Sequence, residues 1–207
     1  LALKYAQTHP ERVLSLVLRG VFLGTREEIE WVYQRGTSRF FPDHWEDFVR
    51  PIPEAERDDL VGAYVRQMQG ADELKRMAAA KAWSAWSGHC ATVQPHQRLI
   101  HHYSDARRAL SRCRVGTHYH ANGCFLEPGE LLDNMALIRH LPATIVHGRF
   151  DMVCPLENAF RLHRAWPGAQ LFIVRDAGHS ATEPTIIDAL VRATRDMASR
   201  FEEDFGV

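Results

Sequence analysis

The 207 residues are enough for one large domain, or for one and a half small ones. Hydrophobic residues make up 45% of the chain and charged residues 25%, which excludes a disordered, collagen-like or coiled-coil protein. Lysine and arginine number 25 against 26 acidic residues, for a net charge of −1. This balance indicates neither nucleic acid nor an anionic membrane as a partner.

The sequence leads us to expect a cytoplasmic protein. No apolar run approaches the ~18–20 residues that a membrane span needs, and no signal peptide pattern opens the sequence. The four cysteines form no CxxC pair, so we expect reduced thiols. The sequence begins inside a helical pattern, without an initiator methionine, and we therefore expect an N-terminally truncated chain.

The first 20 residues predict a helix, a turn and a strand. The helix is expected to end near Thr8, because Pro10 disfavours helical geometry in the residue before it. Residues 13–18 are almost wholly apolar, which is typical of a strand buried on both faces of a parallel sheet.

The middle of the chain is predicted to be mostly helical. Asp43 precedes a short helix, Pro53 opens a helix over 54–68, Gly70 ends it, and Asp72 caps the next one. Aromatic residues concentrate here. They indicate either packing between helices or an aromatic wall over a substrate pocket, and both interpretations can hold at once.

Residues 88–121 show no clean periodicity but are rich in histidine and arginine. Zinc-type side chains occur in and near this stretch, without a recognised metal-binding spacing. We therefore expect no metal site and interpret the histidines as exposed or core residues. The side chains in question are His89, Cys90, Cys113, His118, His120 and Cys124.

The last third alternates between strands and helices. Strands are predicted at 143–148 and 170–174, with a helix over 156–165 between them and a closing helix after residue 184. This order implies a parallel sheet with right-handed crossovers. The expected organisation is an α/β core at 1–24 and 139–207, interrupted by a helical cap at 25–138.

Two short motifs follow the predicted strands of this last third. Asp151 comes three residues after the glycine that ends one strand, and His179 follows the next strand. Alone, Asp151 is a helix cap, a loop-bracing acceptor or a catalytic acid. Ends of neighbouring strands meet at one sheet edge, so the two side chains can form a hydrogen bond in which the acid orients the imidazole.

Such a pair needs a nucleophile. In α/β-hydrolases the chain order is serine, acid, histidine, with the serine in a G-x-S-x-G elbow between a strand and a helix. These 207 residues contain no G-x-S-x-G. The helix at Leu1 is where the helix after the elbow belongs, so the serine is expected before residue 1. Cys154 is expected to pack beside the acid rather than to react.

Beyond these motifs, the chain resembles the prolyl aminopeptidases. Residues 1–13 resemble the family's segment after the nucleophile and 16–20 its next strand, and Trp31, 40–43 and 79–84 resemble its helical cap. Residues 147–155 and 177–181 resemble its acid and histidine motifs. The resemblance covers nearly the whole chain and is weakest over 87–121.

The resemblance implies an α/β-hydrolase fold, Asp151 as the triad acid, His179 as the general base and a small peptide as substrate, with no metal or organic cofactor. It places the serine about five residues upstream of Leu1 and an HGGPG oxyanion motif further upstream. The implied function is a serine exopeptidase that releases N-terminal proline. A chain without the nucleophile is expected to be inactive alone and poorly soluble.

The cap departs from the family at two positions. The resemblance places Trp86, Ser87, Gly116 and Tyr119 at substrate-binding positions, but the family has glutamates where this chain has Ser87 and Gly116. The cap has diverged towards another substrate, or residues 87–121 are corrupted or drifting. Two alternatives to the peptidase therefore stand: another capped hydrolase acting on a different ester or amide, and a non-catalytic remnant or interaction fragment.

Overall fold

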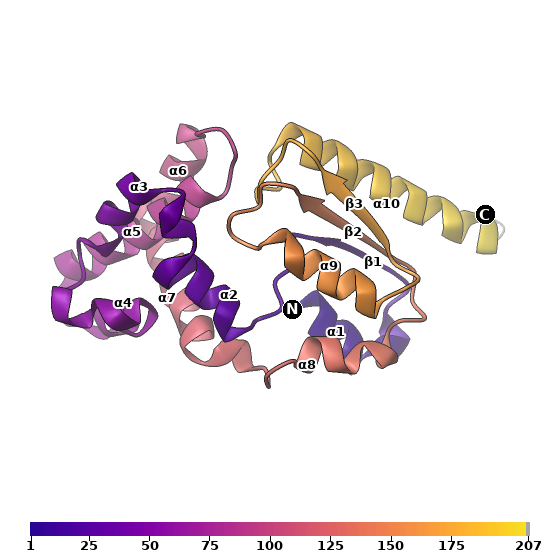
Figure 1. Cartoon of the computed structure of the whole chain (residues 1–207), viewed down its shortest axis with the longest axis horizontal. Helices are drawn as coiled ribbons and strands as arrows, with labels where there is room; N and C mark the ends of the chain where they lie inside the picture. Colours follow the sequence, from indigo (N-terminus) through magenta and orange to yellow (C-terminus); the bar gives the residue numbers. More distant parts are fainter. Residues whose placement is uncertain (206–207) are drawn as a thin grey trace. The chain divides into compact units, whose positions relative to one another are not determined.

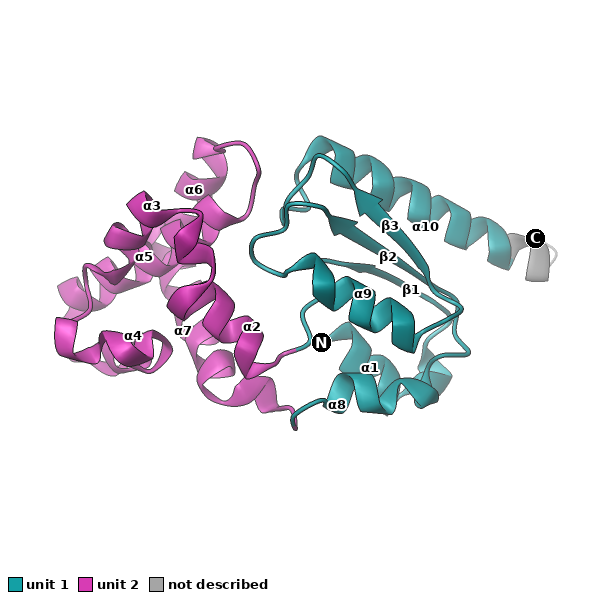
Figure 2. Cartoon of the chain, viewed as in Figure 1, with its two compact units in different colours: residues 1–23, 128–207 teal, residues 24–127 magenta. Residues whose placement is uncertain are grey.

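The chain forms two compact units. A computed structural model describes the backbone of residues 1–205 and the side chains of residues 1–201. We call residues 1–23 and 128–207 the sheet unit, and residues 24–127 the helical unit (Figure 2). Residues 128–138 fall in the sheet unit, where Gln7 of the first helix donates a hydrogen bond of 2.7 Å to the carbonyl of Leu131. The expected core and cap boundaries stay a prediction.

The sheet unit contains a three-stranded parallel sheet. The strands are β1 (Leu16–Arg19), β2 (Ala143–Gly148) and β3 (Gln170–Val174), in the spatial order β1-β2-β3. Leu16 pairs with Ala143, and Thr144 pairs with Gln170. Every residue of the central strand β2 is buried, including the polar residues Thr144 and His147. The predicted parallel sheet is confirmed.

Strand β1 begins later than the apolar run from residue 13 suggested. Residues Pro10–Arg12 form a 3₁₀ turn in which the N–H of Val13 donates to the carbonyl of Pro10 at 3.2 Å. The N–H of Leu16 is the first to reach the sheet edge, where it bonds to the carbonyl of Pro142 at 3.0 Å. The strand therefore starts at Leu16.

Helices cover both faces of this sheet. Helices α9 (Leu156–Ala165) and α10 (Pro184–Phe205) lie on opposite faces, as Figure 1 shows. On the α10 side, Val146 of β2 packs with Ala177, Ile186 and Ala193. The unit also contains α1 (Ala2–Thr8) and the short α8 (Glu130–Asp133), which are joined by an ion pair between Lys4 and Glu130.

The helical unit packs its helices around aromatic side chains. Its helices are α2 (Arg26–Glu30), α3 (Pro42–Val49), α4 (Leu60–Gln69), α5 (Glu73–Cys90), α6 (Gln97–Ser104) and α7 (Ala106–Ala121). Trp86 is almost completely buried, and its indole N–H donates to the carbonyl of Val32 at 3.0 Å. Tyr33 and Trp83 stack with ring centroids 4.1 Å apart. Packing between helices therefore accounts for most of the aromatic residues.

Aspartate caps mark the starts of α4 and α5. The carboxylate of Asp72 accepts from the N–H of Lys75, as predicted for the start of α5. The helix expected over 54–68 is instead divided. Residues Glu54–Asp59 form a 3₁₀ segment, and α4 begins at Leu60 because Asp59 caps it by accepting from the N–H of Gly62. Gly70 ends α4 as expected.

Residues 88–121, where no pattern was visible, contain the end of α5, a loop and two further helices. Asp105 separates α6 from α7 and caps the latter. The buried face of α7 consists of Ala109, Cys113 and Thr117, four residues apart. These side chains are small or polar, so the helical period carries little hydrophobic signal.

The four cysteines are free thiols. Burial raises the pKa of Cys113 to about 12 and also raises that of Cys90, so neither is a thiolate near neutral pH. No helix within residues 1–205 combines the length and the apolar character that crossing a membrane demands.

Candidate active site

Asp151 and His179 meet at the carboxyl edge of the sheet. Asp151 follows the end of β2 and His179 follows the end of β3, and these strands are neighbours. Oδ2 of Asp151 lies 2.9 Å from Nδ1 of His179, and Oδ1 lies 3.1 Å from it. The Asp151 side chain is 1% exposed and that of His179 is 23% exposed. A buried acid thus holds an imidazole whose outer part remains accessible.

The carboxylate of Asp151 is also bound by its own loop. Its Oδ1 accepts hydrogen bonds from the N–H of Val153 at 3.0 Å and the N–H of Cys154 at 2.7 Å. Asp151 does not cap the following helix, because the N-cap of α9 is Pro155. It therefore braces the loop and bonds to His179 at once, and these contacts fix the plane of the carboxylate.

Close backbone packing brings the two motif loops together. A Cβ on Gly148 would lie 2.1 Å from the carbonyl oxygen of Gly178, so only glycine fits at the end of β2. The same two loops are also joined by a hydrogen bond of 2.9 Å, from the N–H of Phe150 to the carbonyl of Ala177. The glycine of the first motif therefore allows the second motif to approach.

Three residues around His179 were not predicted from the sequence to belong to the site. Arg19, at the end of β1, donates a hydrogen bond to the backbone carbonyl of His179. Gly20 follows with φ +55°, and a Cβ there would lie 3.1 Å from Cε1 of the imidazole. Glu183 accepts from the N–H of Gly178 at 2.8 Å. Their position in the sequence could have indicated this role for two of them, because Arg19 and Gly20 directly follow the strand predicted over 13–18.

The same edge holds one group of possible metal ligands among the described residues. Donor atoms of Asp151, Cys154 and His179 all lie within 4.8 Å of one another. Those of Asp151 and His179 already bond to each other, and the Asp151 carboxylate also accepts from backbone N–H groups. Of the zinc-type side chains named from the sequence, His120 and Cys124 approach one another, with Nδ1 and Sγ 3.9 Å apart.

The four substrate-binding candidates all lie in the helical unit, but they do not converge. Trp86 is buried in the aromatic core, whereas Tyr119 is 46% exposed and packs on Phe125. The hydroxyl of Ser87 donates to the carbonyl of Trp83 at 3.0 Å. A Cβ on Gly116 would lie 3.5 Å from the indole nitrogen of Trp83. Ser87 and Gly116 thus share Trp83 as a neighbour.

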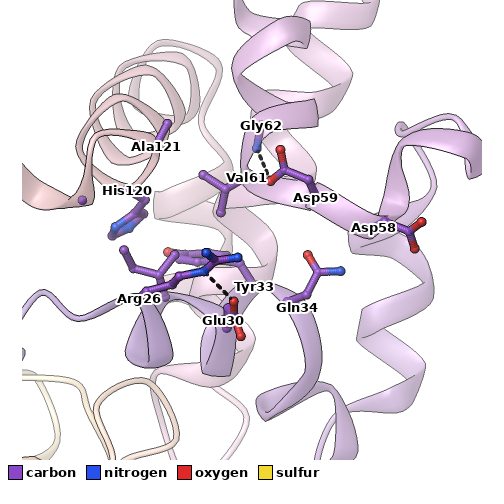
Figure 3. Close-up of a pocket in the computed structure, with 12 residues that line it drawn as sticks. Arg26, Glu30, Tyr33, Gln34, Asp58, Asp59, Val61, Gly62, His120 and Ala121 are labelled. Atoms are coloured by element: carbon purple, nitrogen blue, oxygen red, sulfur yellow. Dashed lines mark hydrogen bonds and ion pairs between the residues drawn. The ribbon is translucent and has the colours of Figure 1, made fainter.

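The helical unit also contains a cavity of about 440 Å³, which the sequence did not indicate. Figure 3 shows its charged and aromatic lining, which includes Arg26, Glu30, Tyr33, Asp58, Asp59 and His120. Hydrogen bonds from Arg35 and Arg26 lower the pKa of Glu30. Burial lowers the pKa of His120 to about 4, so its imidazole is neutral near pH 7. None of the four sequence candidates lines this cavity.

Comparison with known proteins places the chain in a family. Residues 1–183 match the family model described as the alpha/beta hydrolase fold. The chain is 50% identical over 195 residues to a proline iminopeptidase of Xylella fastidiosa, covering 94% of this chain and 62% of that protein. A proline iminopeptidase of Arabidopsis thaliana is 45% identical over 199 residues, and the match covers 95% of this chain and 52% of the Arabidopsis protein. The resemblance to prolyl aminopeptidases is confirmed.

Solved structures agree on the fold. An esterase from Exiguobacterium antarcticum superposes with a TM-score of 0.60 at 22% identity, covering 95% of this chain and 62% of its own. A bromoperoxidase from Bacillus anthracis gives a TM-score of 0.59 at 14% identity, covering 96% of this chain and 63% of its own. The chain spans about 62% of the length of the Xylella relative that it matches. With its parallel sheet, its helical segment and its matched family model, the chain belongs to the α/β-hydrolase fold family.

Proposed function

We propose that this chain carries the acid and the base of a prolyl aminopeptidase, a serine exopeptidase that releases N-terminal proline from peptides. The observation that supports the proposal is the hydrogen bond of 2.9 Å between buried Asp151 and Nδ1 of His179. The names of relatives 41–50% identical to the chain supply the substrate class.

In the proposed reaction each nitrogen of His179 has one task. Asp151 accepts a hydrogen bond from Nδ1–H, which keeps the proton on Nδ1 and leaves Nε2 unprotonated and able to take a proton from a serine hydroxyl. Nε2 of His179 has no hydrogen-bond partner within the part of the chain that the structure describes. The serine oxygen attacks the carbonyl carbon of the N-terminal proline, and His179 then gives its proton to the leaving amine.

Hydrolysis of the acyl-enzyme completes the cycle. His179 takes a proton from water, the resulting hydroxide attacks the prolyl ester, and the proton returns to the serine oxygen. Asp151 stabilises the imidazolium in both halves because its carboxylate stays ionised beside it. These steps need no metal or organic cofactor.

We propose that the serine belongs to a part of the protein outside these 207 residues. A hollow of about 200 Å³ in the sheet unit is lined by Gly20, Arg19 and Leu3, and Gly20 is also the glycine against His179. We propose that a nucleophile-bearing turn occupies this hollow and reaches the imidazole past Gly20. Without such a turn, we expect the 207-residue chain to be inactive.

A chimaera tests the function. The part of the Xylella fastidiosa protein that precedes its matched region is fused to this chain, and release of a chromogenic amine from proline amides is measured. We expect activity in the chimaera and none in the chain alone. Replacing His179 with Ala should lower kcat about 10⁶-fold. A folded chimaera that hydrolyses neither amides nor esters would instead support a non-catalytic remnant.

Two residues of the helical unit, Ser87 and Gly116, favour a second candidate function. A substrate's amino group in a dry pocket needs a carboxylate partner, yet Ser87 and Gly116 stand where the resemblance calls for glutamate. The alternative is a capped hydrolase that acts on another ester or amide. If simple acyl esters outcompete proline amides on the chimaera, the alternative replaces the peptidase.

A further inference from the structure

A second histidine, His147, is buried directly beneath the Asp151–His179 pair. It belongs to the central strand β2, and its side chain is completely buried. Both ring nitrogens have backbone partners: Nδ1 accepts from the N–H of Val21 at 3.2 Å, and Nε2 lies 2.8 Å from the carbonyl oxygen of Cys154. A carbonyl only accepts, so the proton must be on Nε2, and the ring is held in one tautomer.

The backbone of Cys154 connects this ring to the site through the two peptide groups that flank its Cα. Its carbonyl accepts from Nε2 of His147, and its N–H donates to Oδ1 of Asp151 at 2.7 Å. Asp151 in turn accepts from Nδ1 of His179 at 2.9 Å. Two hydrogen-bonded series, from Val21 through His147 to the Cys154 carbonyl and from the Cys154 N–H through Asp151 to His179, therefore meet at Cys154. By fixing the Cys154 carbonyl, His147 restrains the backbone whose N–H orients Asp151.

The charge state of His147 agrees with this role. Burial is the main cause that lowers its pKa, although the neighbouring Asp151 carboxylate acts in the opposite direction. The other charged or titratable groups that act on the ring are His179 and Arg19. Both lower the pKa of His147 further, because they disfavour a positive charge on its ring. His147 is therefore neutral near pH 7. Its Nε2 lies 3.5 Å from Oδ2 of Asp151 but only 2.8 Å from the carbonyl oxygen of Cys154. The hydrogen bond to Oδ2 of Asp151 therefore comes from His179.

We propose that His147 is a positioning residue, which restrains the backbone of Cys154 and thereby orients the Asp151 carboxylate so that His179 keeps its proton on Nδ1. The inference rests on the proposed roles of Asp151 and His179. Its primary readout is the tautomer of His179, which can be measured whether or not the protein hydrolyses proline amides.

Two variants separate the contacts of His147. His147→Gln has an amide that reaches as far as Nε2, so a donor to Cys154 remains. His147→Asn has a shorter amide, which keeps an acceptor for Val21 but withdraws the donor from Cys154. Trp166→Phe is the matched control: it removes a buried hydrogen bond of 3.3 Å from the indole N–H to the carbonyl of Leu141, ahead of the opposite end of β2.

Nitrogen-15 NMR of the His179 ring in the chimaera and in the 207-residue chain measures the fraction protonated on Nδ1. We expect wild type, His147→Gln and Trp166→Phe to show the Nδ1–H tautomer, and His147→Asn to show a mixture. In an active chimaera, kcat should fall about 10²-fold in His147→Asn, with little change in KM, and recover in His147→Gln. Melting temperatures should fall in both His147→Asn and Trp166→Phe.

The role is overturned if His147→Asn keeps His179 fully protonated on Nδ1 while its melting temperature falls as in Trp166→Phe. His147 would then only fill the core. The role is equally overturned if His147→Gln and His147→Asn disturb the His179 tautomer to the same extent, because the contact to Cys154 would not be the one that orients Asp151. An inactive chimaera with the expected tautomers would contradict the proposed function and leave the positioning role intact.

Discussion

Asp151 and His179 are 28 residues apart in the sequence, yet Oδ2 of the first lies 2.9 Å from Nδ1 of the second. Two features produce this contact: β2 and β3 are adjacent parallel strands, and Gly148 lets the loops that follow them touch. The carboxylate is buried and ionic bonds to it are unscreened by water, so the pair is suited to orient an imidazole rather than merely to stabilise the fold.

Replacing Asp151 with Asn tests this orientation. The amide keeps the size of the side chain but can donate a hydrogen bond to Nδ1, which stabilises the wrong imidazole tautomer. We expect kcat of the chimaera on proline amides to fall about 10⁴-fold. The chromogenic assay at saturating substrate measures the change.

Asp176→Asn is the matched control for this substitution. Asp176 lies three residues before His179 in the same motif, but its side chain is exposed. We expect kcat to stay close to that of the parent chimaera. Equal losses in both variants would show that net charge, and not the Asp151 contact, supports the rate.

Gly20 supplies a second test, because its φ of +55° places it against the imidazole. In Gly20→Ala the new Cβ would stand 3.1 Å from Cε1 of His179, so the ring must move. We expect a loss of up to about 10²-fold in kcat, the effect of a misplacement of about 1 Å. The backbone strain of a left-handed alanine should also cost about 1 kcal/mol of stability.

Gly123→Ala separates strain from displacement. Gly123 has φ +56°, and no atom lies within 4 Å of the position of its Cβ. The two variants should therefore lose similar stability in urea unfolding, while only Gly20→Ala loses activity. If Gly123→Ala reduces kcat as strongly, strain alone explains the effect.

The sequence was most informative at the strands that precede the site. The runs at 143–148 and 170–174 both became strands at the predicted residues, although only β2 is buried throughout and β3 exposes Gln170 and Phe172. Their ends carry Asp151 and His179, and the strand order was enough to predict that the two could meet. The geometry of the pair thus followed from topology.

The sequence was least informative where a helix packs small residues. The buried face of α7 is Ala109, Cys113 and Thr117, so the helix had no apolar stripe to recognise. Gly20 and His147 were missed as neighbours of the site for another reason. Their roles depend on contacts across the sheet, with His179 and Cys154, that no local pattern encodes.

The neutral imidazole of His120 predicts a loss of stability in acid. Burial lowers its pKa from the ordinary 6.5 to about 4 in the folded chain. The unfolded chain thus binds a proton below about pH 6.5, whereas the folded chain does so only near pH 4. Stability is fully present above pH 6.5 and declines as the pH falls towards 4, by roughly 3 kcal/mol.

Urea unfolding at pH 7 and at pH 4.5 measures this decline. His120→Phe keeps an aromatic ring beside Tyr33 and should reduce the difference between the two pH values. His101→Gln changes an exposed histidine of α6 and should leave the difference as it is. An unchanged difference in His120→Phe would assign the acid sensitivity to other groups, such as His147 and His89, whose pKa values burial also lowers.

The last prediction concerns the carboxylates that the helical unit lacks. A Cβ on Gly116 would meet the ring of Trp83 at 3.5 Å, an ordinary contact distance, so a longer side chain can begin there without strain. Ser87 also neighbours Trp83, through its hydroxyl. In the double variant Ser87→Glu, Gly116→Glu, we expect kcat/KM for proline amides to rise about tenfold relative to acyl esters, because a buried carboxylate–ammonium pair is worth about 1.5–3 kcal/mol.

Gly116→Ala provides the control, since α7 gains helix propensity from any residue that replaces its glycine. Both Gly116→Ala and the double variant should gain up to about 1 kcal/mol of stability from that source. Only the glutamates should change the ratio of amide to ester hydrolysis, and that change should weaken for substrates with a blocked amino group. A ratio that stays constant across all three proteins would mean that Ser87 and Gly116 do not face the substrate's amine. The alternative of a capped hydrolase with another substrate would then be favoured over the peptidase.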